Sequence, residues 1–240
     1  MNWMSIFASN EFLSIVEILV SFLLVIVAYK LFGRTGLYVW IGMSVILANI
    51  QVFKTVAIFG YVTAMGNVIY SSIFLVTDIL NEVHGKKDAQ KAVWLGFFIL
   101  IATTLLMQLT LLFTPDPSDV TGSNIHAIFS LLPRIAVASL VAYIISQLFE
   151  VWLYALIKKY HGKKYLWFRN NAAAICSQLI DNITFTLIAF WGVLPWPVVW
   201  EIFVTSYILK IVISISDTPF VYWARNMKEV DILENIKNKN

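Results

Sequence analysis

Seven apolar runs, each about twenty residues long or longer, follow one another along this chain with only short polar stretches between them. A run of this length, wound as an α-helix, crosses the roughly 30 Å hydrocarbon core of a bilayer. Backbone groups in lipid must be bonded within such helices or around a closed barrel, and the short alternating segments of a barrel are absent. The sequence therefore predicts an all-α integral membrane protein, a polytopic helical bundle. We place its spans near 11–32, 37–58, 62–83, 90–114, 128–157, 170–191 and 198–224.

The composition supports a membrane protein. Charged residues make up 13% of the chain and the mean hydropathy is +0.79, whereas about a quarter of an ordinary soluble domain is charged. The polar residues form only short loops and a tail, so we expect one transmembrane domain over 1–225 and a polar tail over 226–240. The first run ends in Lys30 and Arg34 without a small-residue cleavage site, which is typical of a retained anchor and not of a signal peptide.

The positions of the basic residues predict the orientation. If the N-terminus is outside, fourteen of the 17 Lys and Arg residues lie in the inner connections and the tail, while the outer connections hold Asp116 and Asp119. By the positive-inside rule the N-terminus is outside and the C-terminus is cytoplasmic. The net charge of +3 is thus a matter of topology, and we expect no nucleic-acid partner.

Six charged residues lie inside the predicted spans, three of each sign. They are Lys54, Arg134, Lys210, Asp78, Glu150 and Asp181. A charge near the bilayer centre costs at least about 2.5 kcal/mol on insertion scales, so such residues usually face the bundle interior or a wet cavity. Two interpretations remain open at this point: ion pairs that lock helices together, or the walls of a polar chamber.

Helical spacing favours the chamber. Four spans each carry one polar, partly aromatic stripe, and helix association alone usually relies on small residues. The stripes are Asn67, Ser71, Phe74 and Asp78; Tyr143, Gln147, Glu150 and Tyr154; Gln178, Asp181, Asn182 and Phe185; and Tyr207, Lys210, Ser214 and Asp217. Pro219 is expected to kink the last span. No metal-ligand, nucleophile or phosphate-loop motif is present, so we expect no metal site, no cofactor and no enzymatic activity.

Several of these segments, in their order and spacing, resemble the bacterial queuosine-precursor transporter family. The matching positions are 47–51; 74–80 with His84 and Gly85; 134–136; 138–143 with Gln147 and Glu150; 181–182; 188–191; and Tyr207 with 210–214. The resemblance covers roughly 37–224, and Glu150 stands where some family members have Asp. It implies a six-helix core similar to the substrate-binding subunits of energy-coupling-factor vitamin transporters, preceded by one additional N-terminal helix.

The resemblance also implies a function, namely uptake of 7-deazaguanine bases across the bacterial cell membrane without an ATPase partner. The substrates would be 7-cyano-7-deazaguanine, its 7-aminomethyl relative and queuine. Such a base offers N–H donors to a carboxylate, a carbonyl to an amide or basic group, and a flat face for stacking. We therefore expect Asp181 at the donor edge, assisted by a set of polar and aromatic residues. They are Asn49, Gln178, Asn182 and Gln147, with Tyr207 or Phe185 stacking and Arg134 or Lys210 at the carbonyl or neutralising Asp181.

Asp78 and Glu150, nearer the inner side, are candidates for gating or proton coupling. Two rival functions remain. One is a binding subunit that docks on cytoplasmic ATPases through a small-x-x-x-small pattern, of which the nearest match here is Ala138 and Ala142. The other is a membrane scaffold whose charges are only structural. The sequence does not decide whether the protein forms a homo-oligomer.

Overall fold

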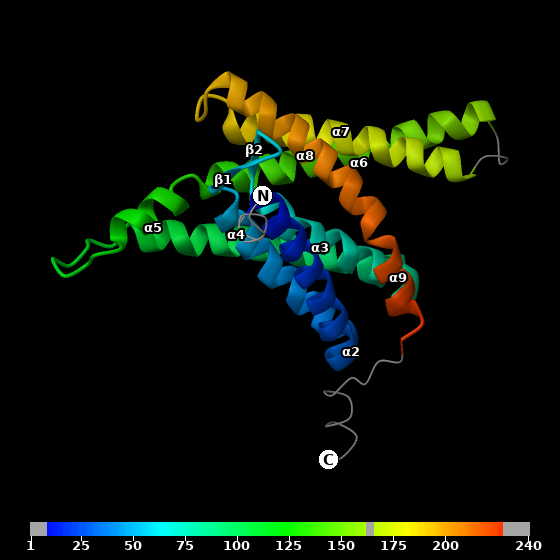
Figure 1. The fold of residues 1–240 in the computed structure, drawn as a ribbon, viewed down its shortest axis with the longest axis horizontal. Helices are drawn as coiled ribbons and strands as arrows, with labels where there is room; N and C mark the ends of the chain where they lie inside the picture. Colours follow the sequence, from blue (N-terminus) through cyan, green and yellow to red (C-terminus); the bar gives the residue numbers. More distant parts are fainter. Residues whose placement is uncertain (1–8, 162–165, 228–240) are drawn as a thin grey trace, which may run out of the picture.

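Helices dominate the structure, a computed structural model that describes residues 9–161 and 166–227 (Figure 1). The elements in chain order are α2 (Asn10–Gln51), β1 (Thr55–Ile58), β2 (Tyr61–Ala64), α3 (Gly66–Ile79), the π-helix η1 (Leu80–His84), α4 (Lys86–Leu111), α5 (Gly122–Phe129), α6 (Leu132–His161), α7 (Leu166–Phe190), α8 (Trp196–Ser216) and α9 (Thr218–Arg225). Most of the predicted tail at 226–240 lies outside the described residues.

The long helix α2 is a hairpin of two helical halves. Gly33 has φ 54° and ψ −141°, a backbone conformation that glycine adopts without a steric penalty. Nε2 of Gln51 lies 3.4 Å from Oε1 of Glu17, whereas these residues would be about 51 Å apart on a straight helix. The halves approach closely at Gly36, where a Cβ would lie 2.4 Å from the carbonyl oxygen of Ala28. The chain therefore turns back on itself at Gly33.

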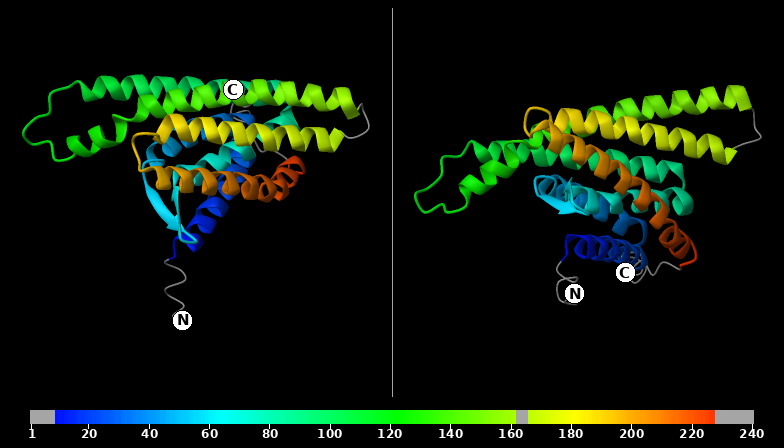
Figure 2. Two further views of the ribbon diagram at one scale, coloured as in Figure 1. Left: turned by 90° about the horizontal axis from the view of Figure 1, so that it is seen from above. Right: turned by 45° about the horizontal axis from the view of Figure 1, so that its top comes forward.

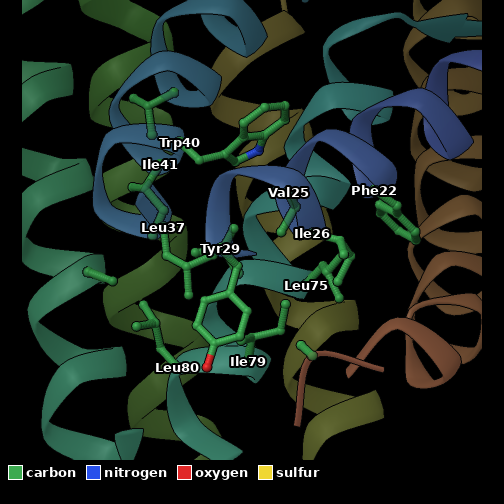
Figure 3. Packing of buried hydrophobic residues seen from close by; sticks show 14 of the residues in the cluster. Phe22, Val25, Ile26, Tyr29, Leu37, Trp40, Ile41, Leu75, Ile79 and Leu80 are labelled. Atoms are coloured by element: carbon green, nitrogen blue, oxygen red, sulfur yellow. The ribbon is translucent and has the colours of Figure 1, made fainter. Parts of the chain in front are cut away.

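The main hydrophobic core fills the space between the two halves of α2 and the helix α3. Figure 3 shows the ring of Tyr29 between side chains from both halves of α2 and from the end of α3. Tyr29, Leu37 and Leu75 are each at most 1% exposed. Phe22 meets Phe220 of α9 edge to face, with 5.1 Å between ring centroids. This core fixes α3 and α9 relative to the N-terminal hairpin.

The hairpin β1–β2 corrects the expectation of a purely helical chain. The two strands pair antiparallel from Thr55–Ala64 to Ile58–Tyr61. Phe59 and Gly60 both have positive φ, as a two-residue hairpin turn with matching twist requires. The predicted ranges 37–58 and 62–83 therefore hold helix only up to Gln51 and from Gly66 onward. Lys54, which was expected inside a span, is exposed between α2 and β1.

Side chains from the helices satisfy the polar backbone of this hairpin. The amide of Val62 donates to Glu201 of α8 at 2.9 Å, and Thr205 of the same helix donates to the carbonyl of Val62 at 3.1 Å. The amide of Phe59 donates to Glu11 at 2.7 Å. These contacts hold the hairpin between α2 and α8.

α6 and α7 run side by side, and α8 crosses them toward α9 (Figures 1 and 2). The last predicted range, 198–224, is divided at Asp217 into α8 and α9, with Pro219 in the first turn of α9. A proline fits there because the first turn of a helix has amides without helical partners. The break thus lies two residues before the proline that was expected to cause it.

Large apolar side chains cover the outward faces of the long helices. Trp94 and Phe98 of α4 and Leu148 of α6 are 71%, 69% and 69% exposed, far more than a water-facing surface usually carries in one place. Within the described residues, three helical stretches are long and apolar enough to cross a membrane. They are Asn10–Gln51, Lys87–Leu111 and Gly122–Ser146.

Candidate functional site

A cavity of about 80 Å³ lies where the end of α2 and the start of α3 meet α6, α7 and α8. Polar and aromatic side chains from all five helices line it. They are Asn49, Asn67, Tyr70, Ser139, Tyr143, Asp181, Asn182, Phe185 and Lys210, with Ala48, Val52, Gly66, Ile135 and Ala142 between them. We call this space the central cavity. It has room for roughly five to eight water molecules or for one small flat ligand.

An ion pair forms one wall of the central cavity. Nζ of Lys210 on α8 lies 2.8 Å from Oδ2 of Asp181 on α7, and the two side chains are 12% and 30% exposed. The pair makes this wall electrically neutral, so two charges can be kept away from bulk water. Asp181 still faces the cavity that it lines, and a carboxylate has four lone pairs. It can therefore accept further hydrogen bonds while it remains paired.

Three asparagine side chains add oriented amides to the lining of the central cavity. Nδ2 of Asn49 donates to the carbonyl of Val45 at 2.7 Å, and Nδ2 of Asn182 donates to the carbonyl of Phe203 at 2.7 Å. Asn67 donates to Oγ of Ser206 at 2.7 Å. One N–H of each amide is thus engaged by the protein, which fixes the orientation of the amide and leaves its carbonyl oxygen able to accept from a ligand. The arrangement favours a ligand rich in N–H donors.

Aromatic rings from three helices complete the enclosure. Tyr70, Tyr143 and Phe185 line the central cavity. The Tyr143 ring is held by Phe97 at 4.7 Å between centroids, and the Phe185 ring by Phe190 at 6.0 Å. Edge-to-face contacts of this kind fix the plane of a ring. A flat heteroaromatic molecule would find stacking partners here.

The start of α3 comes very close to the end of α2 at this cavity. A Cβ on Gly66 would lie 2.5 Å from the carbonyl oxygen of Ala48. Only glycine permits such an approach of two backbones. The close approach brings Asn67 and Tyr70 of α3 to the same cavity as Asn49 of α2.

Five of the residues predicted to bind substrate line the central cavity. They are Asn49, Asp181, Asn182, Phe185 and Lys210. Gln178 is not among its lining residues, and the hydroxyl of Tyr207 points instead to the carbonyl of Ile175 at 3.4 Å. The side chains of Gln147 and Glu150 lie outside the described part of the chain.

Arg134, which was expected to hold the carbonyl of the base or to neutralise Asp181, is not among the residues that line the central cavity. Its Nε donates to the carbonyl of Ile188 at 2.6 Å, and its second guanidinium nitrogen donates to the carbonyl of Trp191. These carbonyls stand at the C-terminal end of α7, where the last turn lacks helical donors and carries partial negative charge. The arginine therefore caps α7.

Tyr70 and Tyr143 were not among the predicted binding residues, although both carry a signal in the sequence. Tyr143 begins the polar stripe of α6. Tyr70 lies three residues after Asn67, on the same face of α3. Neither spacing reveals that these two faces point to the same space, since that depends on how α3 packs against α6.

Asp78 lies at the far end of α3 and lines a second cavity with Asp217. The candidate gating residue is thus separated from the central cavity by about 12 Å of helix, counted from Tyr70.

Comparisons with known proteins agree with this architecture. Residues 64–224 match the family described as "Putative vitamin uptake transporter". A "Probable queuosine precursor transporter" of Bacillus subtilis is 43% identical over 210 residues, which are 87% of this chain and 92% of the relative. The chain belongs to the queuosine precursor transporter family.

More distant relatives carry similar descriptions. A "Queuosine precursor transporter" of Escherichia coli is 27% identical over 70% of this chain and 75% of its own length. A "Probable queuosine precursor transporter" of Haemophilus influenzae is 26% identical over 55% of this chain and 54% of its own. No solved structure matches the chain. Family membership and the long apolar helices make this a multi-pass membrane transporter protein.

Proposed function

We propose that this chain is a secondary transporter that imports 7-deazaguanine precursors of queuosine and binds the base in the central cavity. The observation that carries the proposal is the Asp181–Lys210 pair, which faces a small cavity walled by amides and aromatic rings. The 43% identical relative described as a queuosine precursor transporter supports the same substrate class.

Asp181 is assigned to the donor edge of the base. A 7-deazaguanine presents N1–H and a 2-amino group side by side, and a carboxylate accepts from both with its oxygens. Hydrogen bonds to a charged acceptor contribute roughly 1.5–3 kcal/mol each. The oxygens of Asn49 and Asn182 provide further acceptors for the remaining N–H groups. The donor nitrogens of these amides are engaged by Val45 and Phe203, so the acceptors are oriented before the ligand arrives.

Lys210 serves the carbonyl of the base. Its ammonium has three donors, and one of them is used by Asp181 at 2.8 Å. Another can reach the 6-carbonyl, which lies next to N1–H on the ring. The pair Asp181–Lys210 would then match the edge of a guanine-like base, on which one acceptor is followed by two donors. Adenine presents the opposite pattern at these positions and would be rejected.

The aromatic rings stack on the face of the base. Tyr143 and Phe185 stand on different helices around the central cavity, so a flat ring can lie between them. Base–aromatic stacking contributes roughly 1–3 kcal/mol per base. Stacking gives affinity for any base, and the polar edge gives the selection among bases.

The absence of an ATPase partner is part of the proposal. A binding subunit of the energy-coupling-factor type would dock through exposed small residues, and the nearest such pair here is Ala138 and Ala142. These two are 0% and 1% exposed, and Ala142 lines the central cavity. They are therefore unavailable to a partner helix. We propose a six-helix core like that of those subunits, working alone in the bacterial cell membrane with the N-terminus outside and the C-terminus in the cytoplasm.

The direct test uses a bacterial host that lacks its own importer and makes no 7-deazaguanine precursor, but keeps the later steps that convert a precursor into queuosine in tRNA. With this chain expressed, each 7-deazaguanine is supplied separately and queuosine in tRNA is measured. We expect the modification to return without any energy-coupling-factor ATPase. Return only when those ATPases are present would favour the binding-subunit function, and no return with any of the bases would contradict the proposal. The Asp181→Asn plus Lys210→Met variant serves as the inactive control.

A further inference from the structure

The second cavity, of about 320 Å³, lies where the π-helix η1 meets α9. Its polar lining consists of Asp78, Asn81, Glu82, Asp217, Tyr222 and Arg225. We call it the inner cavity, because the positive-inside rule assigns this end of the bundle to the cytoplasm. It is larger than the central cavity, and its charged residues are mostly acidic.

Asp217 is the buried carboxylate of the inner cavity. It is 3% exposed, and its Oδ2 has no hydrogen-bond partner within the described part of the chain. It occupies the first position before α9, yet its side chain makes no capping hydrogen bond there. A buried, unpartnered carboxylate is expensive to keep ionised. The position therefore indicates that a ligand with positive charge visits Asp217.

Asp78 connects this buried group with solvent. It is exposed and lines the same cavity as Asp217. Two carboxylates in one cavity repel each other, which favours a proton on one of them. Arg225, which lines the same cavity, is paired with Glu82 at 3.1 Å. On the side of η1, His84 packs edge to face on Tyr29 of α2.

Two helices connect the inner cavity with the central one. α3 carries Asn67 and Tyr70 at one cavity and Asp78 at the other. Lys210 lies seven residues before Asp217, which is about two helical turns or roughly 10 Å. A small cavity of about 10 Å³, lined by Tyr70, Phe74 and Lys210, lies between them. Asp217 is therefore joined to the Asp181–Lys210 pair through α8, over about two helical turns.

Both connecting helices are interrupted beside the inner cavity. α8 ends at Ser216 and α9 begins at Thr218, while α3 passes into a π-helix at Leu80. Such interruptions are frequent at functional sites because they let a helix bend. Asp217 lies at one break and Asp78 two residues before the other. Their charge state can thus set the angle at which the helices meet.

We propose that Asp217 binds the proton whose movement into the cell drives substrate import, and that this proton is released to the cytoplasm past Asp78. The proton binds to a carboxylate oxygen, neutralises the buried charge, and leaves through the inner cavity when the carrier faces the cytoplasm. This inference rests on the proposed function.

The test uses purified full-length protein in liposomes that contain a pH-sensitive dye. With an acidic exterior, the wild type should accumulate radiolabelled 7-deazaguanine, and addition of substrate should acidify the interior. Asp217→Asn has no titratable group at position 217, so its accumulation of the labelled base should fall at least tenfold. It should still bind the base and exchange it across the membrane without a gradient. Asp78→Asn should slow accumulation while leaving exchange intact.

Asp88→Asn is the matched control. Asp88 lies at the same end of the bundle, but it pairs with Arg34 at 3.1 Å and Tyr38 at 2.7 Å and does not line the inner cavity. Its accumulation should equal that of the wild type.

Three results would overturn the inference. They are undiminished accumulation by Asp217→Asn, accumulation by the wild type with a sodium gradient but not with a pH gradient, and substrate uptake by the wild type without internal acidification. The last two results come from the wild type alone. The inference can therefore be contradicted even if Asp217→Asn does not fold. If the wild type neither binds nor exchanges any 7-deazaguanine, the proposed function itself is wrong, and that result is distinct from the other three.

Discussion

Nζ of Lys210 lies 2.8 Å from Oδ2 of Asp181, across the contact between α8 and α7 and beside the central cavity. Removing one partner of such a pair leaves the other charge buried and alone, at an expected loss of roughly 3 kcal/mol of stability. Removing both charges avoids that penalty. The pair therefore allows its structural role to be separated from its proposed role in binding.

We predict that Asp181→Asn lowers both thermal stability and uptake, and that Asp181→Asn with Lys210→Met recovers stability alone. The double variant has no unpaired buried charge, but it lacks the acceptor for the N–H edge of the base and the donor for its carbonyl. Binding should weaken at least a hundredfold. Unfolding in detergent followed by tryptophan fluorescence and equilibrium binding of labelled base would measure the two effects. A stable double variant that transports normally would limit the pair to a structural role.

We predict that Tyr143→Leu weakens binding by roughly tenfold to a hundredfold, because the loss of one stacking ring is worth about 1–3 kcal/mol. The helix should tolerate leucine, so the protein level in the membrane should stay near that of the wild type. Tyr207→Leu is the matched control, since Tyr207 does not line the central cavity and its hydroxyl makes only a 3.4 Å contact to Ile175. Equal losses in both variants would contradict the stacking role of Tyr143.

We predict that Arg134→Met lowers stability by about 2 kcal/mol and leaves the affinity of the folded protein for the base within twofold. Its guanidinium binds carbonyls at the end of α7 and does not line the central cavity. Hydrogen bonds to charged groups contribute about 1.5–3 kcal/mol. Denaturation and binding of the same purified sample would compare the two quantities. A large loss of affinity for the base without a loss of stability would instead support a role of Arg134 in substrate binding.

Arg134 also illustrates which part of the site could be predicted from the sequence. A charged residue in an apolar run indicates that a polar or charged partner lies nearby. This applies to Arg134 and to Asp181. The sequence does not say whether the partner is a ligand, another charge or a helix end. Asp181, Asn182 and Phe185 were predicted together because spacing within one helix fixes their common face. The contacts of Arg134 depend on how α6 packs against α7, which spacing does not contain.

The hairpin β1–β2 is the part of the fold that could not be predicted from the sequence. Residues 55–58 form a short apolar run that continues the apolar character of α2, and periodicity cannot distinguish a short buried strand from a helix. Gly60 lies in the hairpin turn with Phe59. The strands form because Glu201 and Thr205 of α8 satisfy their backbone. Those partners are about 140 residues away along the chain.

The orientation of the chain in the membrane is the last prediction, and the sequence is convenient for testing it. Cys176 is the sole cysteine, so Cys176→Ser gives a background on which single cysteines can be placed. Ser118 and Asn226 are both exposed, the first in the loop between α4 and α5 and the second just after α9. With the N-terminus outside, Ser118→Cys should react with a membrane-impermeant maleimide in intact cells, and Asn226→Cys should react only after the cells are opened. The reason is that the connections assigned to the inner side carry the loop Lys and Arg residues, which are retained in the cytoplasm.

Transport by the Cys176→Ser background verifies that the labelled protein is folded. Labelling of Asn226→Cys in intact cells, with Ser118→Cys protected, would reverse the orientation and with it the assignment of the inner cavity to the cytoplasm.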